Sequence, residues 1–233
     1  MFKHIGIVGC SYEGTALCYR TICSESQNQM GEFNHPEITI HTPPLSKYME
    51  LIKVGNWQGV AEIILSSANI LKNAGADFII CPDNTIHEAY ELMIDESPLP
   101  WIHIVEPVVT EAKRQNFSNL ALLGTRYLMT GPVYPNILEE HNIKYRLPDE
   151  DSQEHINHII FSELGNGIFT EKSRHYFNNV IQELKNCGCD AAILGCTEIP
   201  LLIDKNSCPL PTLDSTRLLA KAAVKKSILT QNS

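Results

Sequence analysis

The chain has 233 residues, of which 43% are hydrophobic and 19% charged, and its formal net charge is −9. This composition is typical of a soluble globular protein, and the length allows one large or two small domains. No apolar run approaches the roughly 20 residues that a membrane span needs. The negative charge argues against nucleic acid or an anionic membrane as a partner, since both require a clustered basic surface.

The eight cysteines predict free thiols in a reducing compartment. They include no CxxC pair and no zinc-site spacing, so no metal is expected. The N-terminal segment lacks the apolar region and cleavage site of a secretory signal, which predicts a cytoplasmic protein. Most of the thiols are expected to be small buried side chains: Cys18, Cys23, Cys81, Cys187, Cys189 and Cys208.

In the first half of the chain, short apolar runs alternate with segments of helical periodicity. Ser11 and Asn56 precede two of these segments and are expected to cap them. Such alternation predicts βαβ units around a mainly parallel sheet. The expected strands are 5–8, 37–41, 78–81 and 101–105, and the expected helices are 13–26, 45–51, 57–73 and 85–94.

The second half repeats the scheme. Strands are expected at 120–123, 143–146 and 191–194, and helices at 108–115, up to 141, at 154–164, at 171–185 and at 215–229. We therefore predict an α/β fold with two pseudo-symmetric three-layer domains, mainly parallel sheets and a ligand cleft between the domains. The predicted domains are residues 1–102 with 215–233, and residues 103–214.

Two short stretches, 80–87 and 194–200, occupy equivalent places in the two halves. One offset of 113 positions relates Gly75 to Gly188 and Asp83 to Cys196. A second echo relates the strand that ends at Gly9 to the strand that ends at Gly124. The chain therefore reads as two copies of one α/β unit, each with a side chain that can transfer a proton at the same place.

Two proton-transfer groups on opposite faces of one carbon are what inversion of a stereocentre requires. We expect helices to begin just after both stretches, so that nearby N–H groups bind a carboxylate and favour a thiolate at Cys196. These N–H groups belong to Asn84, Thr85, Thr197 and Glu198. The structural alternative is that Asp83 is a turn or cap residue and Cys196 a buried small side chain.

Several motifs resemble those of the aspartate/glutamate racemase family, which racemises amino acids without pyridoxal phosphate, and the match favours its broad-specificity branch. The likeness covers essentially the whole chain. Residues 9–15 (GCSYEGT) resemble the family's G-M-S-W-E-S-T, 84–87 (NTIH) its N-T-M-H and 123–127 (LGTRY) its L-G-T-R-[FY]. Residues 167–174 resemble G-x-F-x-x-x-S-R, and 194–202 (LGCTEIPLL) is the most specific match.

The resemblance implies a cofactor-independent racemase or epimerase of aspartate, glutamate or a broader range of amino acids. It implies a homodimer that uses no cofactor and whose partner is its small amino-acid substrate. Cys196 and Asp83 take the catalytic positions. The expected substrate-binding residues are Cys10, Ser11, Ile52, Asn84, Thr85, Thr125, Thr197 and Glu198. Thr125 has an equal alternative as a turn residue, and His87 could orient a neighbour, bind substrate or be purely structural.

The chain departs from the family pattern at Asp83, where cysteine or threonine is usual. Free Asp titrates near 3.9 and Cys near 8.5, a mismatch of about 6 kcal/mol at 1.36 per unit. We therefore expect a slow or enantiomer-biased enzyme, or an unusual substrate. Cys81, two positions earlier, should point elsewhere on an extended segment and is not a replacement. Other departures are Cys10 for methionine, Ile52 for glutamine and Leu128 for threonine.

Two other functions remain open from the sequence. One is a decarboxylase or isomerase on the same fold that protonates an enolate with Cys196 alone. The other is a non-catalytic amino-acid-binding protein that has lost its second base. Exchange of the Cα proton separates both from a two-base racemase.

Overall fold

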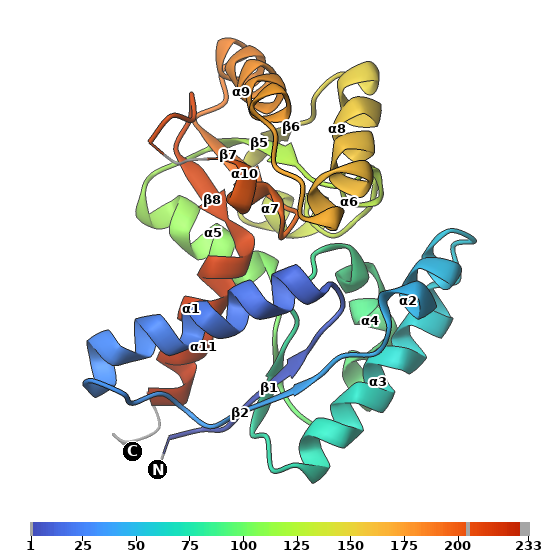
Figure 1. Ribbon diagram of the computed structural model, residues 1–233, viewed down its shortest axis with the longest axis vertical. Coiled ribbons are helices and arrows are strands. Elements are labelled where there is room, and N and C mark those ends of the chain that lie inside the picture. The colour runs from blue at the N-terminus through green and yellow to red at the C-terminus, as the bar shows by residue number, and fades with distance from the viewer. Residues whose placement is uncertain (1, 204–205, 229–233) are drawn as a thin grey trace. The chain divides into compact units, whose positions relative to one another are not determined.

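The computed structural model describes residues 2–203 and 206–228 and confirms an α/β fold with two four-stranded parallel sheets. The chain forms two compact units (Figure 1). The first comprises Met1–Ile104 with Thr216–Ser233, and the second comprises Val105–Ser215. Each sheet belongs to one unit.

The first unit's sheet has the strand order β2-β1-β3-β4. Its strands are β1 (Ile5–Val8), β2 (Ile38–His41), β3 (Phe78–Ile80) and β4 (Trp101–Ile102), all parallel. Every residue of β1 and β3 is buried. Strands of a parallel sheet with helices on both faces are expected to be continuous apolar runs, as these are.

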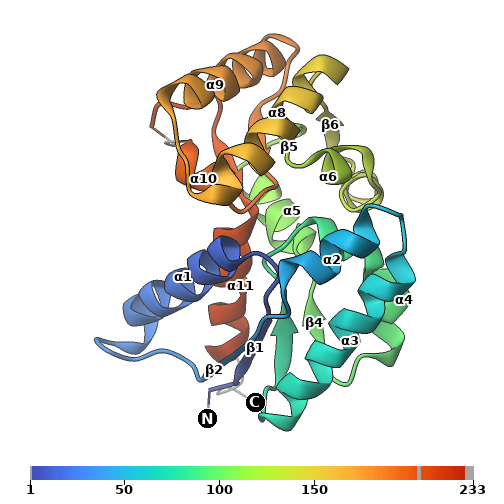
Figure 2. The ribbon, with the colours of Figure 1, turned by 45° about the vertical axis from the view of Figure 1, so that its right-hand side comes forward.

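Helices α1 (Tyr12–Met30) and α11 (Ser215–Ile228) lie on one side of this sheet and α3 (Trp57–Asn73) on the other, as Figures 1 and 2 show. Ser11 and Asn56 cap α1 and α3 as predicted. Their side chains accept from the N–H groups of Gly14 at 3.1 Å and Gly59 at 3.0 Å. α2 spans Leu45–Ile52.

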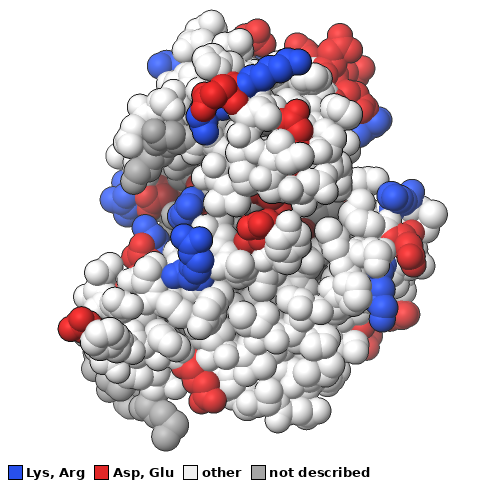
Figure 3. Space-filling view, in the orientation of Figure 1, with Lys and Arg blue, Asp and Glu red and all other residues white. Residues whose placement is uncertain are grey.

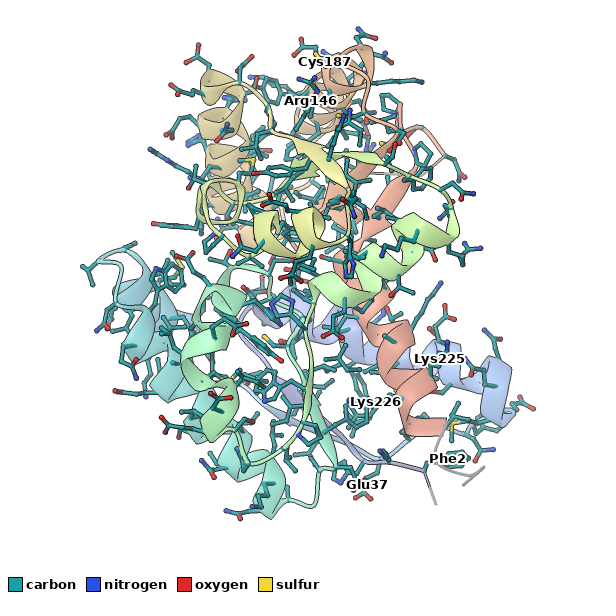
Figure 4. All side chains as sticks on the ribbon, turned by 180° about the vertical axis from the view of Figure 1, so that it is seen from behind. Phe2, Glu37, Arg146, Cys187, Lys225 and Lys226 are labelled. Atoms are coloured by element: carbon teal, nitrogen blue, oxygen red, sulfur yellow. The ribbon has the colours of Figure 1, made fainter. Side chains whose placement is uncertain are left out.

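α11 follows the second unit in sequence but is bound to the first. Lys226, labelled in Figure 4, belongs to α11. Its Nζ lies 5.2 Å from the centroid of the Phe78 ring in β3. Ser227 donates its hydroxyl proton to the carbonyl of Lys3 at 2.6 Å, and its own carbonyl accepts from the N–H of Lys3. The predicted last residue of this helix, 229, lies outside the described residues.

The second unit's sheet has the order β6-β5-β7-β8. Counted along the chain, this is second-first-third-fourth, the same order as in the first sheet. Its strands are β5 (Asn119–Leu123), β6 (Lys144–Arg146), β7 (Ala191–Leu194) and β8 (Thr212–Asp214). The sequence did not predict β8. Three residues that follow a proline-rich segment are too short to show periodicity, and pairing with β7 makes them a strand.

The second unit's main core packs α8 and α9 against one face of its sheet. Ala121, Leu123 and Leu194 from the strands meet Ile160 and Phe177 from the helices. Its helices are α5 (Val105–Arg114), α6 (Arg126–Thr130), α7 (Pro135–Glu140), α8 (Glu150–Ser162), α9 (Glu171–Asn186) and α10 (Ile199–Leu202), with a 3₁₀ turn, η3, at Leu164–Asn166.

Several predicted boundaries are wrong. The expected helix 85–94 is divided into η1 (Thr85–Ala89), α4 (Tyr90–Met93) and η2 (Ile94–Glu96). The expected strand 101–105 ends at Ile102, and α5 begins at Val105 rather than 108. Pro107 is tolerated there because the first helical turn has unpaired N–H groups in any case. The short α6 was not predicted.

All eight cysteines are free, and most are buried. Cys187 is exposed, against the prediction, because it is the C-terminal cap residue of α9 (Figure 4). Cys23 and Cys208 are half-buried. Within the described ranges, no helix combines the length and hydropathy needed to cross a membrane. Acidic and basic side chains both lie on the face drawn in Figure 3.

Candidate active site

The candidate residues lie where the central strands of each sheet end. β1 and β3 are parallel neighbours, so the segments that follow them emerge at the same edge of the sheet. β5 and β7 have the same relation in the second unit. We call Cys10, Tyr48, Cys81 and Asp83 the first strand-end cluster. Thr125, Cys196, Thr197 and Glu198 form the second strand-end cluster.

Asp83 is half-buried and is held at two points. Its carboxylate Oδ1 accepts from the N–H of Ile86 at 3.3 Å. Its main-chain carbonyl accepts from the His87 ring Nδ1 at 2.7 Å. The cap contact that the sequence offered as a structural alternative is therefore present, and it orients the carboxylate at the strand end.

Cys81, two residues before Asp83, has 1% of its surface exposed. Its Sγ is 4.0 Å from the carbonyl oxygen of Asp83. Burial, and next the charge of Asp83, raises the pKa of the Cys81 thiol well above its ordinary value. Cys81 is therefore a neutral thiol, which agrees with its exclusion as the second base.

Tyr48 is the remaining residue of the first strand-end cluster, and it was not identified as a candidate from the sequence. Its side chain is fully buried on α2, and among the described residues its hydroxyl has no hydrogen-bond partner of standard geometry, although the Ser67 side chain is near enough to interact with it. Burial, and next the neighbouring Cys81 and Cys10, raises the pKa of the phenol. Its spacing of one helical turn from Ile52, already a candidate, was the available signal.

The other candidates of the first unit have mainly structural environments. Cys10 and Asn84 are buried, at 5% and 2% exposure. Ser11 caps α1, and Thr85 begins η1 half-buried. Ile52 lies on the buried face of α2, 5% exposed, one turn beyond Tyr48, where an apolar side chain suits its surroundings.

In the second strand-end cluster, the Cys196 thiol is paired with a carboxylate. Its Sγ donates to Oε2 of Glu198 at 2.9 Å. Thr197 donates its hydroxyl proton to the same oxygen at 2.7 Å. The three side chains are 8%, 6% and 4% exposed for Cys196, Glu198 and Thr197. A buried carboxylate that accepts from two donors can orient the thiol proton.

Two glycines let the turns of this cluster approach closely. The N–H of Gly195 donates to the carbonyl of Leu123 at 2.7 Å. A Cβ at Gly195 would lie 2.9 Å from that carbonyl oxygen and 2.4 Å from a methyl group of Leu128. A Cβ at Gly124 would lie 2.7 Å from the same methyl group. The backbone path that presents Cys196 therefore requires glycine at 195.

Thr125 is the cap residue of α6, and its hydroxyl oxygen accepts from the N–H of Leu128 at 3.2 Å. Its turn role is thus present in the structure. Behind Cys196, the hydroxyl of Ser215 donates to the carbonyl of Leu194 at 3.1 Å. The buried Tyr134 hydroxyl forms a hydrogen bond with Ser215. Burial raises the pKa of this phenol, and the hydrogen bond opposes part of that rise.

The helices after the two stretches are short: η1 has five residues and α10 four. Their dipoles are correspondingly smaller than the full macrodipole of a long helix. A groove of about 650 Å³ in the first unit is lined by residues of β2, α2 and α3, among them Lys47 and Glu62, and by none of the candidates. Among residues 2–203 and 206–228, no group of three or more His, Cys, Asp or Glu side chains is arranged to hold a metal ion.

The profile of the Asp/Glu/hydantoin racemase family matches residues 7–223. The broad-specificity amino-acid racemase RacX of Bacillus subtilis (strain 168) is 22% identical over 210 residues, 90% of each chain. A structure from Yersinia pestis, provisionally described as an Asp/Glu racemase, is 33% identical with a TM-score of 0.89, and the match covers 97% of this chain and 99% of that one. An aspartate racemase homologue from Pyrococcus horikoshii OT3 is 27% identical with a TM-score of 0.84 and the same coverages.

Proposed function

The chain belongs to the Asp/Glu/hydantoin racemase family, and we propose that it racemises or epimerises an amino acid without pyridoxal phosphate. It is an isomerase of the amino-acid racemase class, like its relatives. The observation that carries the proposal is the duplicated strand end. Asp83 follows β3 and Cys196 follows β7, the equivalent strands of two sheets with the same order.

In this mechanism the Asp83 carboxylate removes the Cα proton and becomes a carboxylic acid. The electron pair of the Cα–H bond stays on the substrate as a carbanion, which the substrate's own carboxylate and nearby N–H donors stabilise. The Cys196 thiol then donates its proton to the opposite face of Cα and becomes a thiolate. The reverse reaction uses the thiolate as base and the protonated Asp83 as acid.

Glu198 supports the Cys196 half of this reaction. Its Oε2 already accepts a hydrogen bond from the thiol, with 2.9 Å between Sγ and Oε2, and accepts another from Thr197. Each acid–base group is expected to contribute roughly 10²–10⁴-fold. The remaining candidates, Cys10, Ser11, Ile52, Asn84, Thr85 and Thr125, are proposed to bind the substrate.

The substrate is proposed to be aspartate, glutamate or one of the wider range that the name of RacX indicates for that relative. We propose that the protein is a homodimer in the cytoplasm. Eight free cysteines fit a reducing compartment. Light scattering of the purified protein tests the dimer.

The decisive experiment measures deuterium uptake at Cα in heavy water for both enantiomers of each chiral standard amino acid, with dialysed protein and no added cofactor. Asp83→Asn should abolish exchange of one enantiomer, and Cys196→Ser exchange of the other. Cys187→Ser, which removes the exposed thiol, is the matched control.

Two outcomes would overturn the proposal. No exchange of any amino acid by the wild-type protein would indicate a binding protein. Exchange that survives intact in Asp83→Asn would indicate single-cysteine chemistry.

A further inference from the structure

Both ring nitrogens of His87, in the Asn84–His87 motif, contact main-chain atoms. Its Nδ1 lies 2.7 Å from the carbonyl oxygen of Asp83. Its Nε2 lies 3.3 Å from the main-chain nitrogen of Ile104. The ring is 6% exposed and packs against His103, with the two centroids 4.7 Å apart.

These two contacts define the tautomer. The N–H of Ile104 can only donate, so Nε2 must accept and carries no proton. The carbonyl of Asp83 can only accept, so Nδ1 must carry the ring proton and donate it. Burial, and next His103, lowers the pKa of His87 well below its ordinary value, which keeps the ring neutral.

We propose that His87 is a positioning residue for the Asp83 half of the reaction, acting as a neutral bridge between the Asp83 carbonyl and Ile104. Ile104 is the last residue of the first unit before the chain enters the second. The bridge fixes the main chain of Asp83, while Ile86 fixes its carboxylate. This inference rests on the proposed function, because it assigns His87 to one of the two proton transfers.

The two contacts can be separated by substitution. Asparagine at 87 places an amide nitrogen at the Nδ1 position and keeps the donor to Asp83. Glutamine reaches the Nε2 position and can accept from Ile104, but it loses the donor to Asp83. His87→Gln should therefore lower exchange of the Asp83-dependent enantiomer by about 10- to 100-fold. Exchange of the Cys196-dependent enantiomer should not change, and His87→Asn should restore the lost exchange.

His175 supplies the matched control. Its Nδ1 also lies 2.7 Å from the carbonyl oxygen four residues earlier, that of Glu171, but on the exposed surface of α9. His175→Gln and His175→Asn should leave both exchange rates unchanged. The probe is the amino acid with the fastest wild-type exchange, aspartate and glutamate being assayed first.

A second measurement does not depend on activity. Nitrogen-15 NMR of the wild-type protein should show a His87 ring that is protonated at Nδ1 and not at Nε2. The Nε2–H tautomer, or equal loss of exchange of both enantiomers in His87→Gln, would overturn the inference. Absence of wild-type exchange with any amino acid would instead refute the proposed function and would leave the tautomer result to decide the bridge.

Discussion

The two units share one strand order but hold their proposed proton-transfer residues by different contacts. In the second unit, the Cys196 thiol donates a hydrogen bond to the side chain of Glu198. In the first unit, Asp83 is supported through its main chain, by the His87 ring. The shared strand order therefore determines where each residue lies, whereas the contacts of its side chain differ: Cys196 donates to Glu198, and Asp83 accepts from the main-chain N–H of Ile86. The same units differ in their buried histidines, since His4, His87 and His103 of the first are buried. Those of the second are exposed: His141, His155, His158 and His175.

The largest expected effect is a loss of stability of the first unit in acid. Burial lowers the pKa of His103 to about 4, and His87 is lowered as well. As pH falls from 6.5 to about 4, the unfolded chain therefore binds protons that the folded unit does not, and stability falls. His103 alone should account for about 3 kcal/mol across this window, at 1.36 kcal/mol per unit.

Urea unfolding followed by tryptophan fluorescence measures this effect, because Trp57 and Trp101 both belong to the first unit. His103→Phe keeps the aromatic contacts and should flatten the pH dependence. Hydrogen exchange of β5 and β7 should show a smaller change over the same pH range. A wild-type first unit whose stability is constant from pH 7 to pH 4 would contradict the prediction.

The next effect separates the two strand-end clusters. Glu198→Gln removes the charged acceptor of the Cys196 thiol, and a hydrogen bond to a charged group is worth about 1.5–3 kcal/mol. Exchange of the Cys196-dependent enantiomer should fall by roughly 10- to 100-fold, with the Asp83-dependent enantiomer unaffected. Glu163→Gln, a carboxylate of the same unit that is bonded to Ser173 instead, is the control. Equal loss for both enantiomers would show that Glu198 acts on the whole protein rather than on Cys196.

Gly195 and Pro82 occupy the same place in the repeat, one residue before the proposed proton-transfer residue of each half. Gly195→Ala puts a methyl group 2.9 Å from the Leu123 carbonyl oxygen and should cost about 2 kcal/mol through overpacking. Pro82 is also buried, so Pro82→Ala removes ring carbons as well as a backbone restriction, and the restriction alone is worth about 0.4–1 kcal/mol. Chemical denaturation of both variants measures the difference. A Gly195→Ala protein as stable as the wild type would show that the turn can relax.

The smallest effect has opposite signs in the two units. The buried Tyr48 hydroxyl has no hydrogen-bond partner of standard geometry in the part of the chain that the structure describes, so Tyr48→Phe should raise the free energy of unfolding by about 1 kcal/mol. The buried Tyr134 hydroxyl bonds to Ser215, so Tyr134→Phe should lower it by about 1 kcal/mol. Thermal unfolding of the pair is the measurement, and changes of the same sign in both variants would contradict it.

Much of the fold could be predicted from local pattern. The alternation of apolar runs and helical periods predicted seven of the eight strands found in the described residues, and the caps at Ser11 and Asn56 were predicted by residue. β8 escaped because three residues carry no periodicity. The duplication could have predicted β8, because β4 is the last strand of the first sheet and β8 occupies the equivalent place in a sheet of the same order.

The sequence by itself determined the family, the parallel α/β architecture and the equivalence of Asp83 and Cys196, because these depend on local spacing and on an offset along the chain. Only the tertiary structure decided how each candidate is held. Three features depend on where side chains and distant main-chain groups meet. They are the hydrogen bond of Cys196 with Glu198, the buried Tyr48 hydroxyl, and the contacts at both ring nitrogens of His87. Burial of those groups also needs the folded core, and it is burial that keeps the imidazole of His87 neutral.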